Sequence, residues 1–379
     1  MLNPLSQAQI ETITLWHLVQ HSLSSFCKIQ AHYPRLADAL QAGQLPVWQA
    51  LGLHKSHLQR FQEFHTAQGR QNFQHCLQQI QQQSDFVLTC ADPDYPQQLL
   101  PYGDRPPVIF GQGNVQALLQ PQIAIVGSRK PSPHGCQTAY DFAFYLSEQG
   151  FYISSGLAQG IDQAAHQAAL KHRRTIAVMG TGLDQTYPPQ HQSLRRDIQE
   201  RGGAVISEFL PQTLPLQHHF PRRNRIVSGL SLGVIVAEAG LKSGSLITAK
   251  TAAEQGKAVF AIPGHIYGEF HQGCHQLIRE GAILIDHPQQ AVEDLTLPAQ
   301  WQAAQLQPAQ QPAAAEEPNV PAHLQELHQL LDWTGQTLDQ LAQRTQRDAP
   351  ALTAQLMELE LLGLALQQAG CYLRCRAGK

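Results

Sequence analysis

Apolar and polar residues follow different patterns in successive parts of the chain. Up to about Ile80, apolar residues recur at helical spacing between short turns, which predicts a small helical domain at residues 1–85. The stretch from Cys90 to Asn114 contains many prolines, which exclude long helices. It is predicted to be an extended connector with one short strand at Val108–Phe110.

The central region, residues 86–295, alternates short β-branched runs with amphipathic helical stretches. Strands are predicted at Ile123–Gly127, Tyr152–Ser155, Thr175–Met179, Ala204–Ser207, Val234–Ala237, Ala258–Ile262 and Ala282–Ile285. Helices are predicted at Gly135–Glu148, Ile161–His172, Gln190–Arg201, Ser245–Gly256 and His271–Arg279. Strands that are apolar on both faces and joined by helices require a mostly parallel sheet covered on both sides. The predicted fold class is therefore α/β, with a doubly wound, Rossmann-like sheet.

The C-terminal part has two different compositions. Residues 296–321 are rich in Pro, Ala and Gln without apolar periodicity, so they are predicted to be a linker. Within residues 322–379, helices are predicted at His323–Asp332, Thr337–Thr345 and Ala349–Leu362, followed by a hairpin-like tail that turns at Ala369–Gly370. Three short helices and a small β-wing indicate a winged-helix domain.

Charge and cysteine content narrow the functional classes. The chain has 26 Lys+Arg and 29 Asp+Glu, so any nucleic-acid site must be a local patch. Its seven cysteines lack the paired spacing of disulfide frameworks or zinc sites, which predicts reduced thiols. No signal-peptide pattern and no run approaching the ~18 apolar residues of a membrane span is present. The sequence predicts a cytoplasmic protein with no membrane partner, metal or cofactor.

Small residues follow most predicted strands. In an open α/β sheet, ligands bind beyond the carboxyl ends of the strands, where the first helical turns present unpaired N–H groups. Small residues at these ends leave N–H groups exposed along one edge, which suits several phosphates. The residues predicted to bind phosphate here are Gly127, Ser128, Arg129, Ser155, Gly156, Ser243, Gly244, Ser245, Thr248 and Lys250.

The segment HHFPRRNRIVSGLS, from His218 to Ser231, supplies positive charge. It contains Phe220, Arg222, Arg223, Asn224 and Arg225. Guanidinium groups match phosphate oxygens and an aromatic ring can stack on a base, so the segment predicts single-strand binding. The alternative is that the arginines form surface ion pairs and that Phe220 belongs to the core.

Catalytic motifs are incomplete. The GTG tripeptide after the third predicted strand lacks the third glycine of the dinucleotide fingerprint, and GLSLG at Gly229–Gly233 precedes a strand, whereas a nucleophile elbow follows one. Asp162 and His166, at i and i+4, are either an acid/base or metal pair or a helix-locking pair. Glu208 and Glu238 lack an adjacent nucleophile. No catalytic residue is predicted.

Eight motifs together closely resemble, in order, the DprA/Smf family of DNA-processing proteins. They are IAIVGSR (Ile123–Arg129), SSGLAQGIDQAAHQAAL (Ser154–Leu170), TIAVMGTGLDQTYPPQH (Thr175–His191), GAVISEF (Gly203–Phe209), FPRRNRIVSGLS (Phe220–Ser231), EAGLKSGSLITA (Glu238–Ala249), VFAIPG (Val259–Gly264) and LIREGA (Leu277–Ala282). The resemblance covers the whole α/β domain. The N-terminal domain, which would be SAM- or helix-hairpin-helix-like, the connector and a DML1-like winged helix also fit the family.

The resemblance implies a non-enzymatic protein that binds single-stranded DNA, protects DNA taken up in natural transformation, loads RecA onto it and works as a homodimer. The strand-contacting positions of the family fall on Gly127–Arg129, on Phe220, on Arg222–Arg225 and on Ser243–Ser245. The chain departs from the family pattern at three positions, where the family often has an arginine, another basic residue and an asparagine, in the order given next. These positions are Gln159, Gln217 and His275.

Two other functions remain as alternatives. The sheet also resembles that of nucleotide phosphoribohydrolases of the lysine-decarboxylase-like group, so the same edge could hold one nucleotide. Those enzymes are expected to carry a PGGxGT loop, whereas the corresponding place here reads AGLKSGSLITA. The other alternative is a scaffold in which the terminal domains recruit partners. Because Glu358 and Glu360 offer little to a phosphate backbone, the winged helix is predicted to contact protein or to pack.

Overall fold

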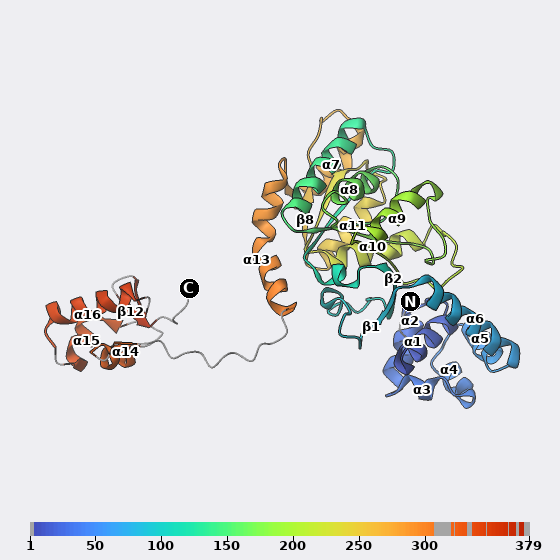
Figure 1. Ribbon diagram of the computed structural model, residues 1–379, viewed down its shortest axis with the longest axis horizontal. Helices are drawn as coiled ribbons and strands as arrows, with labels where there is room; N and C mark the ends of the chain where they lie inside the picture. The colour runs from blue at the N-terminus through green and yellow to red at the C-terminus, as the bar shows by residue number, and fades with distance from the viewer. Residues whose placement is uncertain are drawn as a thin grey trace. The chain divides into compact units, whose positions relative to one another are not determined.

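The chain divides into two compact units, Met1–Leu306 and Gln307–Lys379 (Figure 1). In a computed structural model, the described residues are 4–306, 320–321, 323–331, 336–345, 347–362, 364–368 and 371–374. Within them, no helix combines the length and apolarity needed to cross a bilayer.

The first unit begins with six α-helices in the region for which the apolar spacing predicts helical structure. They are α1 (Gln7–Leu18), α2 (Leu23–His32), α3 (Leu36–Ala39), α4 (Leu45–Ala50), α5 (Lys55–Phe64) and α6 (Ala67–Gln83). Side chains of Ser6, Ser22 and Thr66 accept hydrogen bonds from the first turns of α1, α2 and α6 and fix where these helices begin. Figure 1 shows the helices gathered beside the first strands of the sheet.

A nine-stranded sheet forms the centre of the first unit, in the order β1-β2-β6-β5-β4-β3-β7-β8-β9. Its strands are β1 (Phe86–Thr89), β2 (Val108–Gly113), β3 (Gln122–Gly127), β4 (Tyr152–Ser155), β5 (Thr175–Val178), β6 (Ala204–Ser207), β7 (Gly233–Glu238), β8 (Ala258–Ala261) and β9 (Ile283–Leu284). The strands from β6 to β9 are parallel, and β1 and β2 add an antiparallel hairpin beside β6. The predicted α/β class with a mostly parallel sheet is confirmed.

Helices cover both faces of the sheet. They are α7 (Pro133–Glu148), α8 (Ile161–Ala169), α9 (Gln192–Glu200), α10 (His219–Leu230), α11 (Ser245–Glu254), α12 (Gln272–Arg279) and α13 (Pro288–Leu306). Residues of α10, α11 and α12 share one core cluster, and those of α7, α8 and α13 share another. The chain winds to one side of β3 and then returns to β7 on the other, so β3 and β7 form the switch point of the doubly wound fold.

Two predicted segments differ in the structure. The predicted helices do not include the segment from His218 to Ser231, but its arginines lie within α10, which begins at His219. The predicted linker at 296–321 begins too early, because α13 continues to Leu306. Within the predicted linker, Ala299 packs against the core cluster that α7 and α8 share, and Gln302 donates to the backbone oxygens of Leu119 and Gln120. The Pro-, Ala- and Gln-rich composition conceals these contacts. Residues 307–319 lie outside the described residues.

The N-terminal helices share a core with the sheet. Ile13 of α1 and Phe61 of α5 belong to the same buried cluster as Phe110 of β2 and Val205 of β6. The Nε1–H group of Trp16 also donates to the backbone oxygen of Glu208, at 2.7 Å. The boundary predicted at residue 85 therefore separates two kinds of secondary structure within one compact unit.

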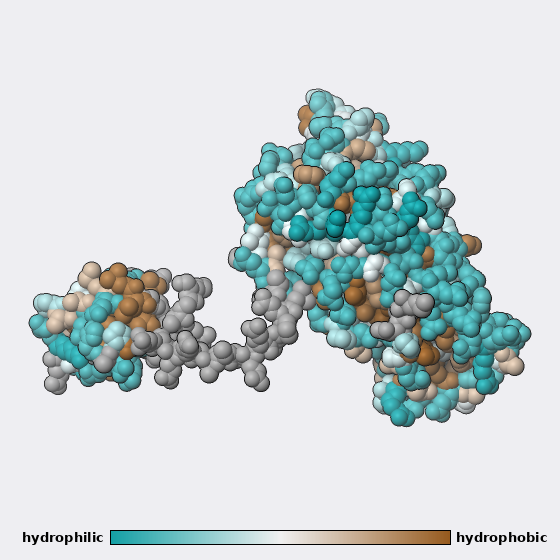
Figure 2. Space-filling model, viewed as in Figure 1, coloured by the Kyte–Doolittle hydropathy of each residue, from teal (hydrophilic) through white to brown (hydrophobic). Residues whose placement is uncertain are grey.

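The second unit contains α14 (Gln325–Leu330), α15 (Leu338–Thr345) and α16 (Ala349–Leu361), with β10 (Gln336–Thr337), β11 (Ala365–Gln368) and β12 (Cys371–Arg374). The strands form an antiparallel sheet in the order β10-β12-β11 beside a leucine-rich core, which confirms the predicted winged helix. The predicted turn at Ala369–Gly370 and the helix end at Asp332 lie outside the described residues. Figure 2 shows apolar surface on this unit, where Met357, Leu361 and Leu366 are exposed.

Candidate nucleic-acid interface

The carboxyl ends of the parallel strands form one edge of the sheet, called the carboxyl edge here. At its switch point, Ser128 follows β3 and donates its backbone N–H to the backbone oxygen of Glu238, the last residue of β7, at 2.7 Å. A Cβ on Gly127 would lie 2.6 Å from Cγ1 of Ile161, so glycine is needed for α8 to pack against the strand end. Gly127 and Ser128 therefore anchor the turn, which leaves the next residue, Arg129, exposed.

The turn after β4 is held by a buried aspartate. The Oδ2 atom of Asp162 accepts the backbone N–H groups of Gly156, at 3.0 Å, and Ala158, at 3.3 Å. Ser155 donates its hydroxyl to the backbone oxygen of Ile125, at 2.7 Å. Ser155 and Gly156 were predicted to bind phosphate, but the Ser155 hydroxyl and the Gly156 N–H already have hydrogen-bond partners inside the protein. Burial raises the pKa of Asp162, and the nearby charge of Arg223 opposes that rise.

Arg223 is buried beneath this turn, with 3% of its surface exposed. Its guanidinium donates to the backbone oxygen of Gly156, at 2.5 Å, and to that of Val178. A Cβ on Gly156 would meet this guanidinium at 2.4 Å, so the glycine makes room for it. The side-chain oxygen of the half-buried Asn224 accepts from Nε of Arg223, at 3.2 Å. Burial lowers the pKa of Arg223 to about 10, and the neighbouring Asp162 opposes this lowering, so Arg223 stays charged at neutral pH.

Arg222 and Arg225 share one buried carboxylate. Arg222 donates from Nε and Nη2 to the two oxygens of Glu208, at 3.1 and 2.9 Å, and Arg225 donates to Oε2 of Glu208 at 2.6 Å. The Arg222 guanidinium also lies 5.2 Å from the ring centre of Trp16 and 5.4 Å from that of Phe209. The Arg225 side chain is only 8% exposed. Both guanidinium groups thus serve the fold, which corrects the expectation that the whole arginine cluster faces the edge.

Arg129 and Phe220 line a small pocket on the carboxyl edge, together with Gly156, Tyr187 and Arg223, and this is called the Arg129 pocket here. The Arg129 guanidinium lies 5.2 Å from the ring centre of Phe220. The Phe220 and Tyr187 rings are 5.4 Å apart and tilted by 39°, and Tyr187 is 42% exposed. None of the ion pairs between described residues includes Arg129. The pocket therefore offers an exposed cation beside exposed aromatic surface, which is the pairing that single-stranded nucleic acid requires.

The loop between β7 and α11 adds hydroxyl groups to the carboxyl edge. The hydroxyls of Ser243 and Ser245 lie 2.7 Å apart, and nothing stands within 4 Å of a Cβ built on Gly244, so the loop is open to a ligand. Thr248 is 1% exposed and unavailable. Lys250 is exposed, but it lines a groove with residues of β8 and β9, a full turn of α11 beyond Ser245. The structure brings the serine loop, but not these last two residues, to the edge.

Three further residues belong to this surface and were missed by the sequence prediction. Lys130 and Lys242 are exposed, and each lies next to a predicted residue, Arg129 and Ser243. Tyr187 reaches the pocket from the loop after β5. The lysines were detectable because they follow strand ends in sequence. Tyr187 lies beyond the end of its strand by nine residues, so only the folded loop reveals its place.

The carboxylates considered as general bases have structural partners. Glu238 is fully buried and accepts the backbone N–H of Ser132, at 2.9 Å, and the hydroxyl of Ser132, at 2.5 Å, so it fixes the start of α7. His166 contacts the hydroxyl of Thr175 at 2.6 Å, while Asp162 binds the turn after β4, which supports the helix-locking interpretation of that pair. Among the described residues, no group of three or more potential ligands is placed to hold a metal ion.

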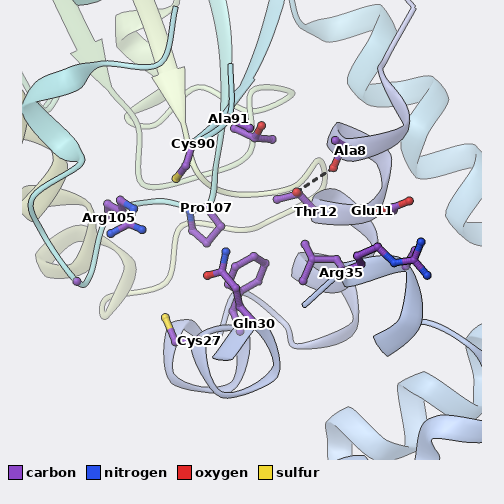
Figure 3. Close-up of a pocket in the computed structure, with 15 residues that line it drawn as sticks. Ala8, Glu11, Thr12, Cys27, Gln30, Arg35, Cys90, Ala91, Arg105 and Pro107 are labelled. Atoms are coloured by element: carbon purple, nitrogen blue, oxygen red, sulfur yellow. Dashed lines mark hydrogen bonds between the residues drawn. The ribbon is translucent and has the colours of Figure 1, made fainter. Parts of the chain in front are cut away.

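A separate cavity of about 480 Å³ lies between the N-terminal helices and the connector (Figure 3). Figure 3 shows Thr12, Glu11, Cys27 and Gln30 on the helical side and Cys90, Arg105 and Pro107 on the connector side. Arg35 pairs with Asp38 at 2.9 Å, and Arg105 donates to two backbone oxygens. Because both cations have partners and Glu11 adds negative charge, this cavity does not extend the candidate interface.

The chain is similar to known proteins over most of its length. The family model described as DNA recombination-mediator protein A matches residues 86–296, and the model of the DprA winged helix domain matches residues 310–370. Protein Smf of Escherichia coli K12 is 39% identical over 336 residues, which is 87% of each chain. DNA processing protein DprA of Streptococcus pneumoniae R6 is 44% identical over 221 residues, 58% of this chain and 77% of the relative.

Two solved structures resemble the fold. DprA of Streptococcus pneumoniae superimposes with a TM-score of 0.63 at 34% identity, covering 77% of this chain and 98% of the other. DNA processing protein A of Helicobacter pylori, whose structure addresses its single-stranded DNA binding mode, gives a TM-score of 0.51 at 30% identity, covering 56% of this chain and 96% of the other.

Replacement of Glu208 by glutamine should destabilise the first unit strongly. The change leaves Arg222 and Arg225 without their shared counter-charge, and breaking a buried pair from one side costs about 3–5 kcal/mol. Urea unfolding at neutral pH measures the effect. Asp197→Asn is the matched control, because the exposed pair of Asp197 with Arg201 is worth at most about 1 kcal/mol. Equal losses in the two variants would contradict the role given to Glu208.

Proposed function

Because this chain belongs to the DNA recombination-mediator protein A family, which includes the DprA and Smf proteins, we propose that it binds single-stranded DNA along the carboxyl edge of its sheet. The observation that carries the proposal is the Arg129 pocket, where an exposed guanidinium lies over one aromatic ring and beside a second. The single-strand binding mode described for the Helicobacter pylori relative supports the same partner.

Single strands are preferred over duplex DNA in this proposal. Aromatic rings can stack only on bases that are not already stacked on the adjacent bases of a duplex. Phosphate contacts position a strand without reading its sequence. Duplex recognition in the major groove uses a helix or ribbon that presents side chains to base edges. The arginines of α10 donate to Glu208, Gly156 and Val178 inside the protein, so these guanidinium groups are not presented to base edges. Binding should therefore depend little on base identity.

The residues of the carboxyl edge divide into two roles. Contact with DNA is assigned to Arg129, Phe220, Tyr187, Lys130, Lys242, Ser243 and Gly244, which are exposed or line the open loop and the pocket. Ser245 is buried, and its hydroxyl lies 2.7 Å from that of Ser243, which it positions. Positioning is assigned to Gly127, Ser128, Ser155, Gly156, Arg222, Arg223, Asn224 and Arg225, whose groups are engaged within the protein. Buried Thr248 and distant Lys250 take no part.

The protein holds DNA without turning it over. Glu208 and Glu238, which an enzyme on this edge would use as bases, are fully buried and bonded to Arg222, Arg225 and Ser132. A general base must reach the proton that it removes, and neither carboxylate reaches the Arg129 pocket. This supports binding over a phosphoribohydrolase-like activity.

The biological role in the proposal is to protect DNA taken up in natural transformation and to load RecA onto it in the cytoplasm. The description of the matching family as a recombination mediator supports this role. A binder that contacts phosphates and base faces leaves the order of bases unread, so it accepts any incoming strand. This property is the one that a loader of recombinase onto arbitrary sequence needs.

A homodimer is also part of the proposal, and the outer edge of β9 supports it. Both residues of this edge strand are exposed, Ile283 by 42% and Leu284 by 48%, and among the described strands β9 pairs only with β8. An exposed apolar edge is a template for pairing with another strand. A second copy of the chain that docks there would cover it.

Loss of Arg129 and loss of Phe220 should affect DNA binding differently. Arg129→Ala should weaken oligothymidine binding and reduce the log–log salt slope by about 0.7, because one phosphate contact disappears. Tyr187→Ala and Phe220→Ala should cost on the order of 1–3 kcal/mol of binding through lost stacking, and Tyr187→Ala should leave the slope unchanged. Fluorescence anisotropy at several salt concentrations measures both quantities.

The control is Arg201→Ala, since Arg201 lies between α9 and β6 at the opposite edge of the sheet. Its affinity should equal that of the parent, and all variants should melt at the parental temperature. Parental affinity in folded Arg129→Ala and Phe220→Ala, or equal affinity of the parent for single strands and duplex, would show that the site lies elsewhere.

RecA loading predicts a kinetic effect. Nucleation of RecA filaments on single-stranded DNA, followed by the RecA ATPase, should start with a shorter lag when this protein is present. Arg129→Ala should restore the longer lag because the strand is no longer held. An unchanged lag at protein concentrations that saturate the strand would contradict this part of the proposal.

Charge placed on β9 should disrupt the dimer. The combined substitution Ile283→Lys and Leu284→Lys puts two cations on the edge where apolar side chains are exposed. Light scattering after gel filtration should give twice the chain mass for the parent and the single-chain mass for the variant. Leu241→Lys, an exposed residue of the loop after β7, is the control and should stay dimeric. A dimeric β9 variant would place the interface on another surface.

A further inference from the structure

A second groove, of about 990 Å³, lies where the N-terminal helices meet the segment before α10. It is called the Arg60 groove here, and its walls come from α1, α5, α6 and residues 210–219. We propose that this groove holds a further stretch of the same single-stranded DNA. The strand would leave the carboxyl edge and continue onto the N-terminal helices α1 to α6, called the helical region here. This inference rests on the proposed function, because it extends the path of the same ligand.

Position along the sheet makes the groove a continuation of the carboxyl edge. Arg129 follows β3, Gly156 follows β4, Phe220 packs beside Gly180 at the end of β5, and Phe209 follows β6. With strands about 4.8 Å apart, these ends span roughly 15 Å in the direction of the helical region. A strand that contacts Arg129 and runs past β5 therefore arrives at β6.

The two sites meet at the first turn of α10. There the ring of His219 stacks on Phe209, with centres 4.3 Å apart, and Phe209 meets His21 of the helical region edge-on at 5.4 Å. The backbone N–H of Leu210 donates to Nε2 of His21, at 3.2 Å. His219 and His21 line the Arg60 groove, while Phe220, the next residue after His219, lines the Arg129 pocket.

The groove carries one cation among neutral polar groups. Arg60 lines it together with amide side chains, which are those of Gln20, Gln68, Gln71, Asn72, Gln79 and Gln212. Arg60 forms no ion pair with any described residue, and its partner is the amide oxygen of Gln20. No carboxylate lines the groove. Glu63, which opposes the lowering of the Arg60 pKa by burial, and Asp184, which accepts the backbone N–H of Gln212 at 2.9 Å, lie outside it.

Three of the histidines that line the groove, His17, His21 and His219, add hydrogen-bonding capacity more than charge. Burial lowers the pKa of His17 to about 4 and that of His21 to about 3, and it also lowers the pKa of His219. These rings are therefore neutral at neutral pH. A single guanidinium with many amide and imidazole groups suits a single strand of DNA, which carries one negative charge per nucleotide and exposes the edges of its bases. A free nucleoside triphosphate would require several cations at one point.

Oligothymidines of two lengths test the inference. A strand of about 6 nucleotides should fill the Arg129 pocket and its neighbours, and one of about 20 should also reach the Arg60 groove. Arg60→Gln should leave the affinity for the short strand unchanged, weaken binding of the long strand several-fold and reduce its salt slope by about 0.7. Arg35→Gln, which removes an exposed arginine from another side of the helical region, is the matched control and should leave both affinities unchanged.

A second variant protects the test against a folding defect. Gln68→Glu combined with Gln71→Glu places two carboxylates on the exposed side of α6 without removing a core contact, and it should weaken only the long strand. If both groove variants bind the long strand like the parent, or weaken the short and long strands equally, the inference is wrong. Capture of an acidic peptide in place of the long strand would also overturn it.

The outcomes separate this inference from the proposed function. If Arg129→Ala weakens the short strand and the groove variants change nothing, only the groove assignment fails. If Arg129→Ala has no effect while Arg60→Gln weakens the long strand, the groove binds DNA and the carboxyl-edge site fails. If the parent binds neither strand, both fail.

Discussion

The buried carboxylate of Glu208 holds together the parts of the first unit that build the candidate interface. Its side chain bonds to Arg222 and Arg225 of α10, and its backbone oxygen accepts the indole of Trp16 in α1. Removing one partner of such a buried group costs about 3–5 kcal/mol, a large share of the stability of an ordinary domain. The orientation of α10, and with it the positions of Phe220 and Arg223, therefore depends on this contact. The helical region is fixed to the end of β6 by the same residue, which places the Arg60 groove next to the carboxyl edge.

This arrangement explains how a chain with a formal net charge of -3 can present a positive surface. Arg222 and Arg225 share the single negative charge of Glu208, and a third arginine, Arg223, is buried but charged beneath the pocket. Arg129 then stands exposed over Phe220, and the exposed Lys130 and Lys242 follow the ends of β3 and β7. A few exposed cations beside aromatic rings favour a strand that can bend and unstack over a rigid duplex. They also predict a modest salt dependence, since few counterions are released.

The sequence predicted the fold well because its signals are local. Strands such as Tyr152–Ser155 and Ala204–Ser207 are short apolar runs that end in small or polar residues, and the structure has them at the same bounds. The carboxyl edge was also predicted, since topology alone brings parallel strand ends together. The roles of the arginines were not predictable, because whether Arg222 meets phosphate or Glu208 depends on a partner 14 residues away that only the folded chain brings near. Tyr187 and Arg60 were missed for the same reason, since loop and helix packing decide where they lie.

The central claim is that Arg129 faces the DNA while Arg222 faces Glu208, and the Nε–H signals of the arginine side chains test it most directly. A proton–nitrogen correlation spectrum recorded before and after addition of an oligothymidine, with signals assigned by single Arg→Lys variants, reports on each guanidinium separately. The account predicts that the Arg129 signal shifts on binding, while the Arg222 signal, whose Nε–H donates to Glu208 at 3.1 Å, stays in place. A shift of Arg222 as large as that of Arg129, or an unmoved Arg129, would contradict it.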